Sequence, residues 1–330
     1  MQWYVCWRMT SNRVAIGIAS VLAACGNQAP MTRSAPATAG VPSHGFELPV
    51  VVENHRWFLQ TETADGIGLR LYLDSAGGSY LTRAAAERLK LEIAHVKTEA
   101  GEMDAVPFPR LADPRIPRPK SDPVPVLATS AFDGDDGMLG APWFAGHTFT
   151  FDYPNQRLVL RAQSEFPEVP AEHLVAVGFP RDARGDPTSP YGRISMIVDG
   201  KAFDMLFDTG ATVDLTEAAL AALGGGAQQR ATSFITQTVF DGWRAAHPEW
   251  RVVEAGDRTV EGAPLIEVPK ITVGGFDVGP VWFTWRPDRA FHEWMAQWMD
   301  KPTEGALGGS AFHTLRITVD WIRGTAAFER

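Results

Sequence analysis

The fold of this chain is decided by FDMLFDTGAT at residues 203–212. The stretch begins as an apolar run, which predicts a buried strand, and the strand ends at the carboxylate of Asp208. Small residues follow, and they predict a tight turn beside that carboxylate. Asp-Thr-Gly is a weak signal by itself, because three residues recur by chance. Its weight comes from a second copy of the whole unit.

The chain contains an internal duplication, which a fixed offset reveals. Shifted by 134 positions, DGIGLRLYLDS at 65–75 falls without a gap on DGKAFDMLFDT at 199–209. The match continues through an expected helix, where Leu81, Thr82, Ala84, Ala85 and Leu89 fall on Leu215, Thr216, Ala218, Ala219 and Leu223. Shifted by 168, DGMLG at 136–140 falls on EGALG at 304–308, and Phe144, Thr150 and Asp152 fall on Phe312, Thr318 and Asp320. We therefore expect 34 extra residues in the second copy, between Leu223 and Thr303.

Composition is that of a globular protein, with 330 residues, 45% hydrophobic and 21% charged. This length predicts two domains. The net charge of -9 argues against nucleic acid as a partner, which would require a basic face. The two cysteines, Cys6 and Cys25, both precede the body of the chain, so no disulfide framework or cysteine-based zinc site is expected there.

The N-terminus has the pattern of a secretory signal peptide. Arg13 precedes an apolar run at 14–24, which is too short to span a bilayer. Leu22-Ala23-Ala24-Cys25 resembles the lipobox of bacterial lipoproteins, which predicts lipid attachment at Cys25; the alternative is an ordinary signal peptide with a chance cysteine. We expect a lipid-anchored protein of the bacterial cell envelope, on the outer membrane and facing the periplasm if the cell is Gram-negative. Residues 26–45 are rich in small residues and proline, which predicts a flexible tether.

Six tryptophans distinguish the extra length of the second copy, namely Trp243, Trp250, Trp282, Trp285, Trp294 and Trp298. Phe291, Trp294, Met295 and Trp298 follow helical spacing and predict a helix with one apolar face. Core packing is the favoured role for that face. A wall of a substrate cleft and a surface resting on the membrane are the alternatives.

The paired motifs resemble two retropepsin-like aspartic peptidase domains in tandem. In the second copy they are Phe207-Asp208-Thr209-Gly210-Ala211 and Ala306-Leu307-Gly308, and in the first they are Leu73-Asp74-Ser75 and Met138-Leu139-Gly140. The resemblance implies a mostly β fold, with two homologous retropepsin-like β-barrel lobes and short helices in a pepsin-like bilobal arrangement around a central cleft. The expected domains are the signal peptide with its lipobox at 1–25, the tether at 26–45, and lobes at 46–165 and 166–330.

The same resemblance implies a catalytic dyad of Asp74 and Asp208, one from each lobe. Two close carboxylates share one proton, so one can activate a water molecule while the other donates to a peptide carbonyl. Ser75 and Thr209 would brace the two loops against each other, and Ala76, Gly77, Gly210 and Ala211 would complete them. The implied substrate is a polypeptide, and neither a cofactor nor a metal is required. Because both acids lie in one chain, we expect a monomer.

The first loop departs from the family pattern. It reads Asp-Ser-Ala-Gly where the second reads Asp-Thr-Gly-Ala. If Ala76 required a positive φ, the strain would cost about 1 kcal/mol or more. The loop could instead form around Gly77 and Gly78 and still present Asp74. Two functions therefore stay open, an aspartic endopeptidase and an inactive peptide-binding or structural envelope lipoprotein on the same fold.

Other features of the sequence are less specific. Residues 92–106 predict a hairpin, which is either the flap that aspartic peptidases have at this place or a plain surface hairpin. His292-Glu293 lacks the second histidine of a zinc peptidase motif, because Ala296 stands there. The acids Asp133, Asp135 and Asp136 lack the spacing of a calcium loop, so we expect a solvated turn.

Overall fold

The computed structural model describes residues 45–98, 101–130, 134–260 and 262–330. The predicted signal peptide, the lipid attachment at Cys25 and all of the tether except Gly45 lie outside the described residues. Within the described ranges, no helix is long and apolar enough to cross a membrane.

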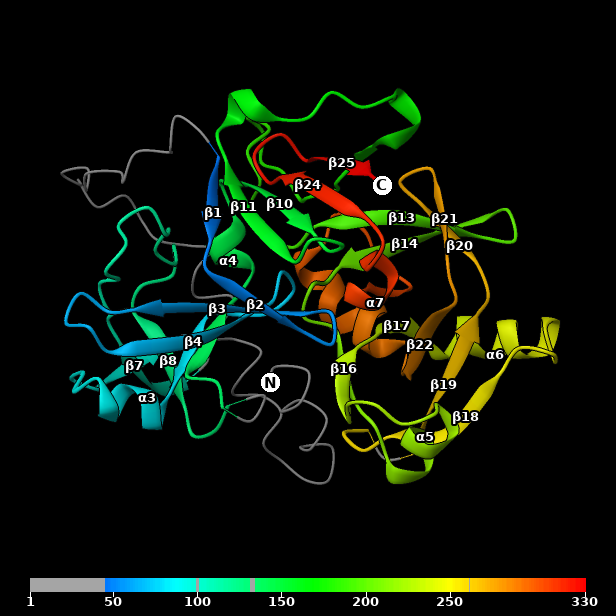
Figure 1. Cartoon of the computed structure of the whole chain (residues 1–330), viewed down its shortest axis with the longest axis horizontal. Coiled ribbons are helices and arrows are strands. Elements are labelled where there is room, and N and C mark those ends of the chain that lie inside the picture. The colour runs from blue at the N-terminus through cyan, green and yellow to red at the C-terminus, as the bar shows by residue number, and fades with distance from the viewer. Residues whose placement is uncertain (1–44, 99–100, 131–133, 261) are drawn as a thin grey trace.

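The described chain forms three large sheets (Figure 1). The first lobe is built on an eight-stranded sheet whose spatial order is β2 (Val50–Glu53), β3 (Arg56–Glu62), β4 (Gly68–Leu73), β9 (Gly137–Leu139), β5 (Tyr80–Thr82), β8 (Val124–Leu127), β7 (Gly101–Val106) and β6 (Ala94–Thr98). The second lobe has nine strands in the order β18 (Val252–Asp257), β19 (Ala263–Val268), β22 (Val281–Arg286), β17 (Ser233–Thr236), β23 (Gly305–Leu307), β14 (Lys201–Phe207), β13 (Arg193–Val198), β20 (Ile271–Val273) and β21 (Phe276–Val278).

A third sheet of six strands joins the lobes, in the order β1 (Phe46–Leu48), β11 (Arg157–Arg161), β10 (Thr148–Asp152), β24 (Arg316–Asp320), β25 (Thr325–Glu329) and β12 (Leu174–Ala176). A two-stranded ribbon pairs β15 (Thr212–Asp214) with β16 (Gln229–Ala231). The α-helices are short: α3 (Arg83–Arg88), α4 (Ala141–Phe144), α5 (Glu217–Ala222), α6 (Gln237–Ala246) and α7 (Gly309–Phe312). Single turns complete the described structure at η1 (Gln163–Glu165), η2 (Ala171–His173), η3 (Ala290–Trp294) and η4 (Met295–Trp298).

The two lobes share one topology. In the first, β9 lies between β4, to which it runs parallel, and β5, to which it runs antiparallel, and β5 runs parallel to β8. In the second, β23, β14, β17 and β22 repeat these three relations. The predicted fold class is thereby confirmed, because the chain is mostly β and its two lobes are built on the same strand plan.

The strand pairing corrects the predicted equivalence of the helices. Tyr80 pairs with Met138, and its counterpart beside Ala306 is Phe234. Therefore β17 and α6, and not the aligned segment around α5, take the places of β5 and α3. The sequence match reflects local structure, since Thr82 and Thr216 each accept a hydrogen bond from an N–H at the start of their helices. Part of the extra length thus lies at 212–231, a segment that begins before Leu223, where the alignment had it begin.

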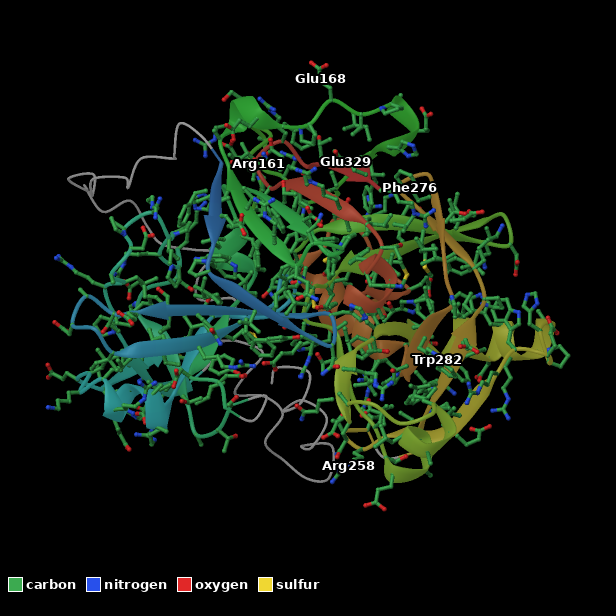
Figure 2. The ribbon with its side chains drawn as sticks, in the orientation of Figure 1. Arg161, Glu168, Arg258, Phe276, Trp282 and Glu329 are labelled. Atoms are coloured by element: carbon green, nitrogen blue, oxygen red, sulfur yellow. The ribbon has the colours of Figure 1, made fainter. Side chains whose placement is uncertain are left out.

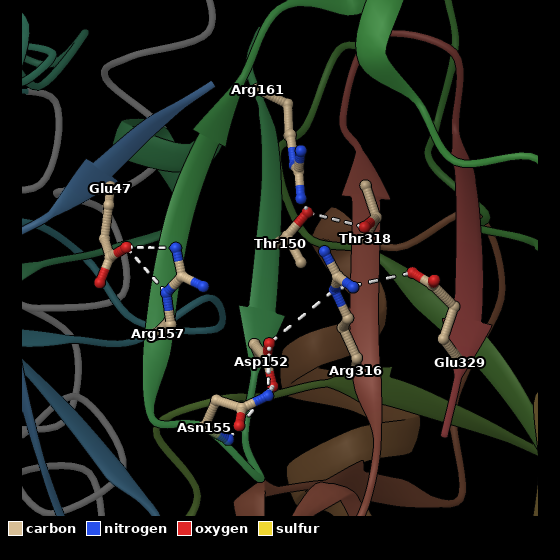
Figure 3. Close-up of polar contacts among 9 residues, drawn as sticks. All are labelled: Glu47, Thr150, Asp152, Asn155, Arg157, Arg161, Arg316, Thr318 and Glu329. Atoms are coloured by element: carbon tan, nitrogen blue, oxygen red, sulfur yellow. Dashed lines mark hydrogen bonds and ion pairs between the residues drawn. The ribbon is translucent and has the colours of Figure 1, made fainter. Parts of the chain in front are cut away.

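The centre of the joining sheet lies between β10 and β24, where the two copies meet (Figure 3). Thr150 faces Thr318, its counterpart in the duplication, and their buried hydroxyl oxygens are 2.7 Å apart. The Glu47–Arg157 pair on the outer strands is exposed and contributes little to stability. The hydroxyl of Thr150 also accepts from Arg161 Nε at 3.0 Å, so two polar contacts meet at this buried point.

An aromatic core beneath this sheet joins the lobes. Phe151 of the first lobe lies against Phe207 of the second, with ring centroids 6.1 Å apart, and Phe144 stacks on Trp321 at 5.2 Å. All four side chains are almost completely buried. Since Phe207 directly precedes Asp208, this core fixes the strand that carries one of the two predicted catalytic acids.

The buried hydroxyl pair gives a test of the junction. Thr150→Val should lower the free energy of unfolding by about 1–3 kcal/mol, because Thr318 loses its partner and Arg161 Nε loses an acceptor that now lies at 3.0 Å. Adding Thr318→Val should recover the part of the loss that comes from the unpaired Thr318 hydroxyl, since two apolar groups of the same shape then face each other. Urea unfolding measures both. Additive losses in the double variant would contradict the assignment.

Candidate active site

Each predicted catalytic acid lies at the end of a strand that is held from behind by a second strand. Asp74 follows β4, and its N–H donates to the carbonyl oxygen of Leu139 at 3.1 Å. Asp208 follows β14, and its N–H donates to the carbonyl oxygen of Leu307 at 3.0 Å. Both acceptors belong to the paired motifs quoted above, Met138-Leu139-Gly140 and Ala306-Leu307-Gly308.

The glycines of these elements allow a close approach to each loop. A Cβ at Gly140 would lie 2.2 Å from the carbonyl oxygen of Gly77, and one at Gly308 would lie 2.0 Å from that of Thr232. The N–H groups of the two glycines donate to Ser79 Oγ at 3.0 Å and Ser233 Oγ at 3.2 Å. Sequence reasoning missed these two serines, because the alignment did not bring them to equivalent positions.

Ser75 and Thr209 hold the two loops together by reciprocal hydrogen bonds. The N–H of Ser75 donates to Thr209 Oγ1 at 3.0 Å, and the N–H of Thr209 donates to Ser75 Oγ at 2.9 Å. Each hydroxyl then donates to the opposite strand, Ser75 to the Phe207 carbonyl at 2.8 Å and Thr209 to the Leu73 carbonyl at 3.3 Å. All of these groups are buried, so leaving one unpaired would cost about 1–3 kcal/mol.

The carboxyl groups of Asp74 and Asp208 meet between the braced loops and hydrogen-bond to each other. Asp74 Oδ1 accepts from the N–H of Ala76 at 2.8 Å, and Asp208 Oδ1 accepts from the N–H of Gly210 at 2.9 Å. Asp74 is 7% exposed and Asp208 is 1% exposed. The structure thus brings the two predicted acids together in a nearly water-free site.

The surroundings raise the pKa values of both carboxyl groups, but by different amounts. Burial raises the pKa of Asp74, while the N–H of Ala76 and the hydrogen bond from Asp208 act against the rise. Burial raises the pKa of Asp208 much further, assisted by the negative charge of Asp74 and by their mutual hydrogen bond. Both shifts favour the neutral form, so the pair retains a proton at a pH at which an isolated exposed carboxyl group is ionised.

The glycines of both loops surround Asp74. A Cβ at Gly210 would lie 2.1 Å from Asp74 Cγ, and a Cβ at Gly77 would lie 2.6 Å from Asp74 Oδ2. Neither glycine has a positive φ, so space and not backbone conformation requires them. The exchanged order of Ala and Gly in the two loops follows, since each loop keeps its glycine where the carboxyl group of Asp74 approaches.

Ala76 fits its loop without backbone strain. It is absent from the described residues with positive φ, so the condition for a conformational cost is not met. Its methyl group is buried in an apolar cluster that includes Ala211, Tyr191, Phe291 and Met295. The loop reads Asp-Ser-Ala-Gly, which departs from the family pattern, and it still directs the carboxyl group of Asp74 toward Asp208.

Tyr72 braces the second loop from the first lobe, and sequence reasoning missed it. Its buried hydroxyl donates to the carbonyl oxygen of Gly210 at 3.0 Å and lies 3.0 Å from Thr212 Oγ1. The aligned residue of the second copy is the apolar Leu206, so the brace exists on one side only. The difference between Tyr72 and Leu206 was the one sequence signal that could have pointed to this contact.

The tryptophan-rich segment packs beside the loops that follow Asp74 and Asp208. The predicted helix is a turn of π-helix, η3, followed by a turn of 3-10 helix, η4. Phe291 and Met295 are buried in the cluster that contains Ala76 and Ala211, which confirms core packing for them. Trp294 and Trp298 are partly buried against the same cluster. The predicted hairpin at 92–106 is formed by β6 and β7, but residues 99–100 at its turn lie outside the described part, so its role as a flap stays a prediction.

No family model matches the chain, and no curated protein matches it. Among solved structures, the chain is similar to an aspartic proteinase from Irpex lacteus, with 10% identity and a TM-score of 0.47, over 86% of this chain and 96% of that chain. It is also similar to Basic 7S globulin from soybean, with 8% identity and a TM-score of 0.42, over 87% and 95% of the two chains. At these scores the likeness carries no argument about activity, and the site rests on the contacts described above.

The crowding at Asp74 predicts opposite tolerance at aligned positions. Gly210→Ala should lower the free energy of unfolding by about 1–3 kcal/mol, because the new methyl group overlaps the carboxyl group of Asp74. The matched variant Ala76→Gly should cost only about 1 kcal/mol, from added backbone freedom and a lost methyl contact. Urea unfolding of both variants measures the difference. Equal losses would contradict the asymmetric packing around Asp74.

The raised pKa of Asp208 predicts a pH-dependent stability. Because the folded state holds this proton more tightly than the unfolded state, the free energy of unfolding should fall as pH rises above about 4. Asp208→Asn should make that fall shallower, so that the variant gains stability relative to the wild type toward neutral pH. Thermal unfolding between pH 3 and 7 measures it, with the exposed Asp186→Asn as control. Parallel curves for the wild type and Asp208→Asn would contradict the assignment.

Proposed function

We propose that this protein is an aspartic endopeptidase, with Asp74 and Asp208 as its dyad and a polypeptide as its substrate. The observation that carries the proposal is the pair of hydrogen-bonded, buried carboxyl groups on cross-braced loops. A shared proton between two such groups is the arrangement required for general acid–base hydrolysis.

In the proposed reaction the two acids have different roles. The protonated Asp208 donates its proton to the carbonyl oxygen of the peptide bond, while the ionised Asp74 takes a proton from the attacking water. The new bond joins the water oxygen to the carbonyl carbon. Collapse of this gem-diol breaks the C–N bond as Asp74 gives its proton to the amide nitrogen, while Asp208 takes the proton of one hydroxyl and the dyad returns to its starting state. No covalent enzyme intermediate, metal or cofactor takes part.

A second function is favoured by the burial of the site. With Asp208 1% exposed and Asp74 7% exposed, the dyad presents little surface to a substrate in this structure. A peptide-binding or structural envelope protein that retains the fold and its paired acids, without turnover, is consistent with that burial. The two functions differ in one measurable property, the cleavage of peptide bonds.

The proposal includes the location predicted by the sequence. Cys25 would carry a lipid, residues 26–45 would tether the lobes at 46–165 and 166–330, and a single chain would act at the bacterial envelope. Support for this part comes from the sequence pattern at 13–25. Mass spectrometry of the membrane fraction tests it, since lipid on an N-terminal Cys25 is the expected product.

Peptide cleavage distinguishes the two functions. The chain from residue 26 should cleave a mixed peptide library between pH 3 and 7, and Asp74→Asn and Asp208→Asn should each lower the rate by a factor of about 10² to 10⁴. Asp186→Asn serves as the exposed-carboxylate control and should retain the wild-type rate. Absence of cleavage by a folded wild type, or equal cleavage by the dyad variants, would remove the peptidase assignment.

A further inference from the structure

A cavity of about 320 Å³ lies between the lobes, and neither Asp74 nor Asp208 lines it. The turn between β2 and β3 reaches the second lobe there, and the N–H of Ala231 donates to the carbonyl oxygen of Asn54 at 3.0 Å. In Figure 1 this turn ends beside β16 and α7. The segment at 212–231 supplies the opposite wall, so both copies of the duplication line the cavity.

The floor of the cavity is apolar. Val213, Leu215 and Leu265 line it and are almost fully buried, and Leu223 and Pro280 extend it. Trp282, labelled on the second lobe in Figure 2, adds a partly buried indole ring. This lining suits an alkyl or aryl group, since small-molecule sites are mostly apolar with a few polar groups that fix orientation.

One cation lines the same cavity without a carboxylate partner. The guanidinium of Arg230 donates from Nε to the carbonyl oxygen of Ala227 at 2.8 Å and from Nη2 to that of Gly225 at 2.9 Å. In the described part of the chain, Nη1 has no hydrogen-bond partner and no acid pairs with Arg230. Partial burial lowers the pKa of this guanidinium, which shows that its charge is incompletely solvated.

The remaining polar lining is basic or neutral. The Nδ1–H of His313 donates to the carbonyl oxygen of Ser310 at 2.8 Å. The second ring nitrogen, Nε2, takes no part in that bond. His55 lies beside it, with ring centroids 5.2 Å apart. Among the described residues that line the cavity, none is Asp or Glu. The cavity thus combines an apolar floor with an unneutralised positive charge.

We propose that this cavity binds a small amphipathic carboxylate, with its acid group on Arg230 and its apolar chain against Trp282 and the leucines. The volume of about 320 Å³ lies within the range of small-molecule sites. A straight-chain acid of eight carbons, with two carboxylate oxygens, is a ligand of suitable size. The bound anion would supply the charge partner that Arg230 lacks.

Octanoate is the probe. It is titrated calorimetrically into the full chain, which is held in detergent, and the octanoate is kept below its own micelle concentration. Wild-type protein should bind it more tightly than octan-1-ol, which lacks the charge, and than acetate, which lacks the chain. Arg230→Met should weaken octanoate by about tenfold to a hundredfold, the effect of losing a hydrogen bond to a charged group, and leave octan-1-ol unchanged. Arg244→Met removes an exposed arginine elsewhere and should change neither ligand.

Trp282→Ala keeps the charge and removes an apolar wall, so it should weaken octanoate and octan-1-ol alike. Unfolding curves of each variant establish that it is folded before titration. Equal octanoate affinity in the wild type and Arg230→Met would overturn the proposal. So would binding of octan-1-ol as tight as that of octanoate, or no octanoate binding by the folded wild type. The result is independent of peptide cleavage, which the dyad variants test.

Discussion

The reciprocal hydrogen bonds between Ser75 and Thr209 constrain the rest of the structure. Each residue uses its N–H and its hydroxyl across the lobe boundary, so the two loops can separate only by leaving buried polar groups unpaired. The lobes must therefore approach closely at this point. The joining sheet and the aromatic core around Phe151 and Phe207 also join the two lobes, and Phe207 directly precedes Asp208 in the chain.

The scaffold is nearly symmetric, but the chemistry that it holds is not. Gly77 and Gly210 both make room for Asp74, and Tyr72 supports only the loop of Asp208. Asp208 is the more deeply buried acid, so the free energy of ionisation differs between two residues with the same backbone setting. The duplication places two carboxyl groups in equivalent backbone settings, and the side chains around them differ between the copies.

The duplication made both the lobes and the paired acids predictable, because one ungapped offset aligns Asp74 with Asp208. The same offset misplaced the helix, since Thr82 and Thr216 begin similar helices whose places in the sheets differ. A helix cap depends on residues close together in the sequence, whereas the order of strands in a sheet depends on segments that are far apart. The conformation of Ala76 and the contacts of Tyr72, Ser79 and Ser233 depend on residues from distant segments, so no single-sequence pattern contained them.

The segment at 212–231 connects the two sites of this molecule. Its first residue, Thr212, contacts Tyr72 beside the dyad, while Val213 and Arg230 line the cavity. The two strands of this segment pair directly, Thr212 with Ala231 and Val213 with Arg230, so a shift at one end moves the other. The segment that the alignment misplaced therefore reaches from the loop of Asp208 to the lining of the cavity.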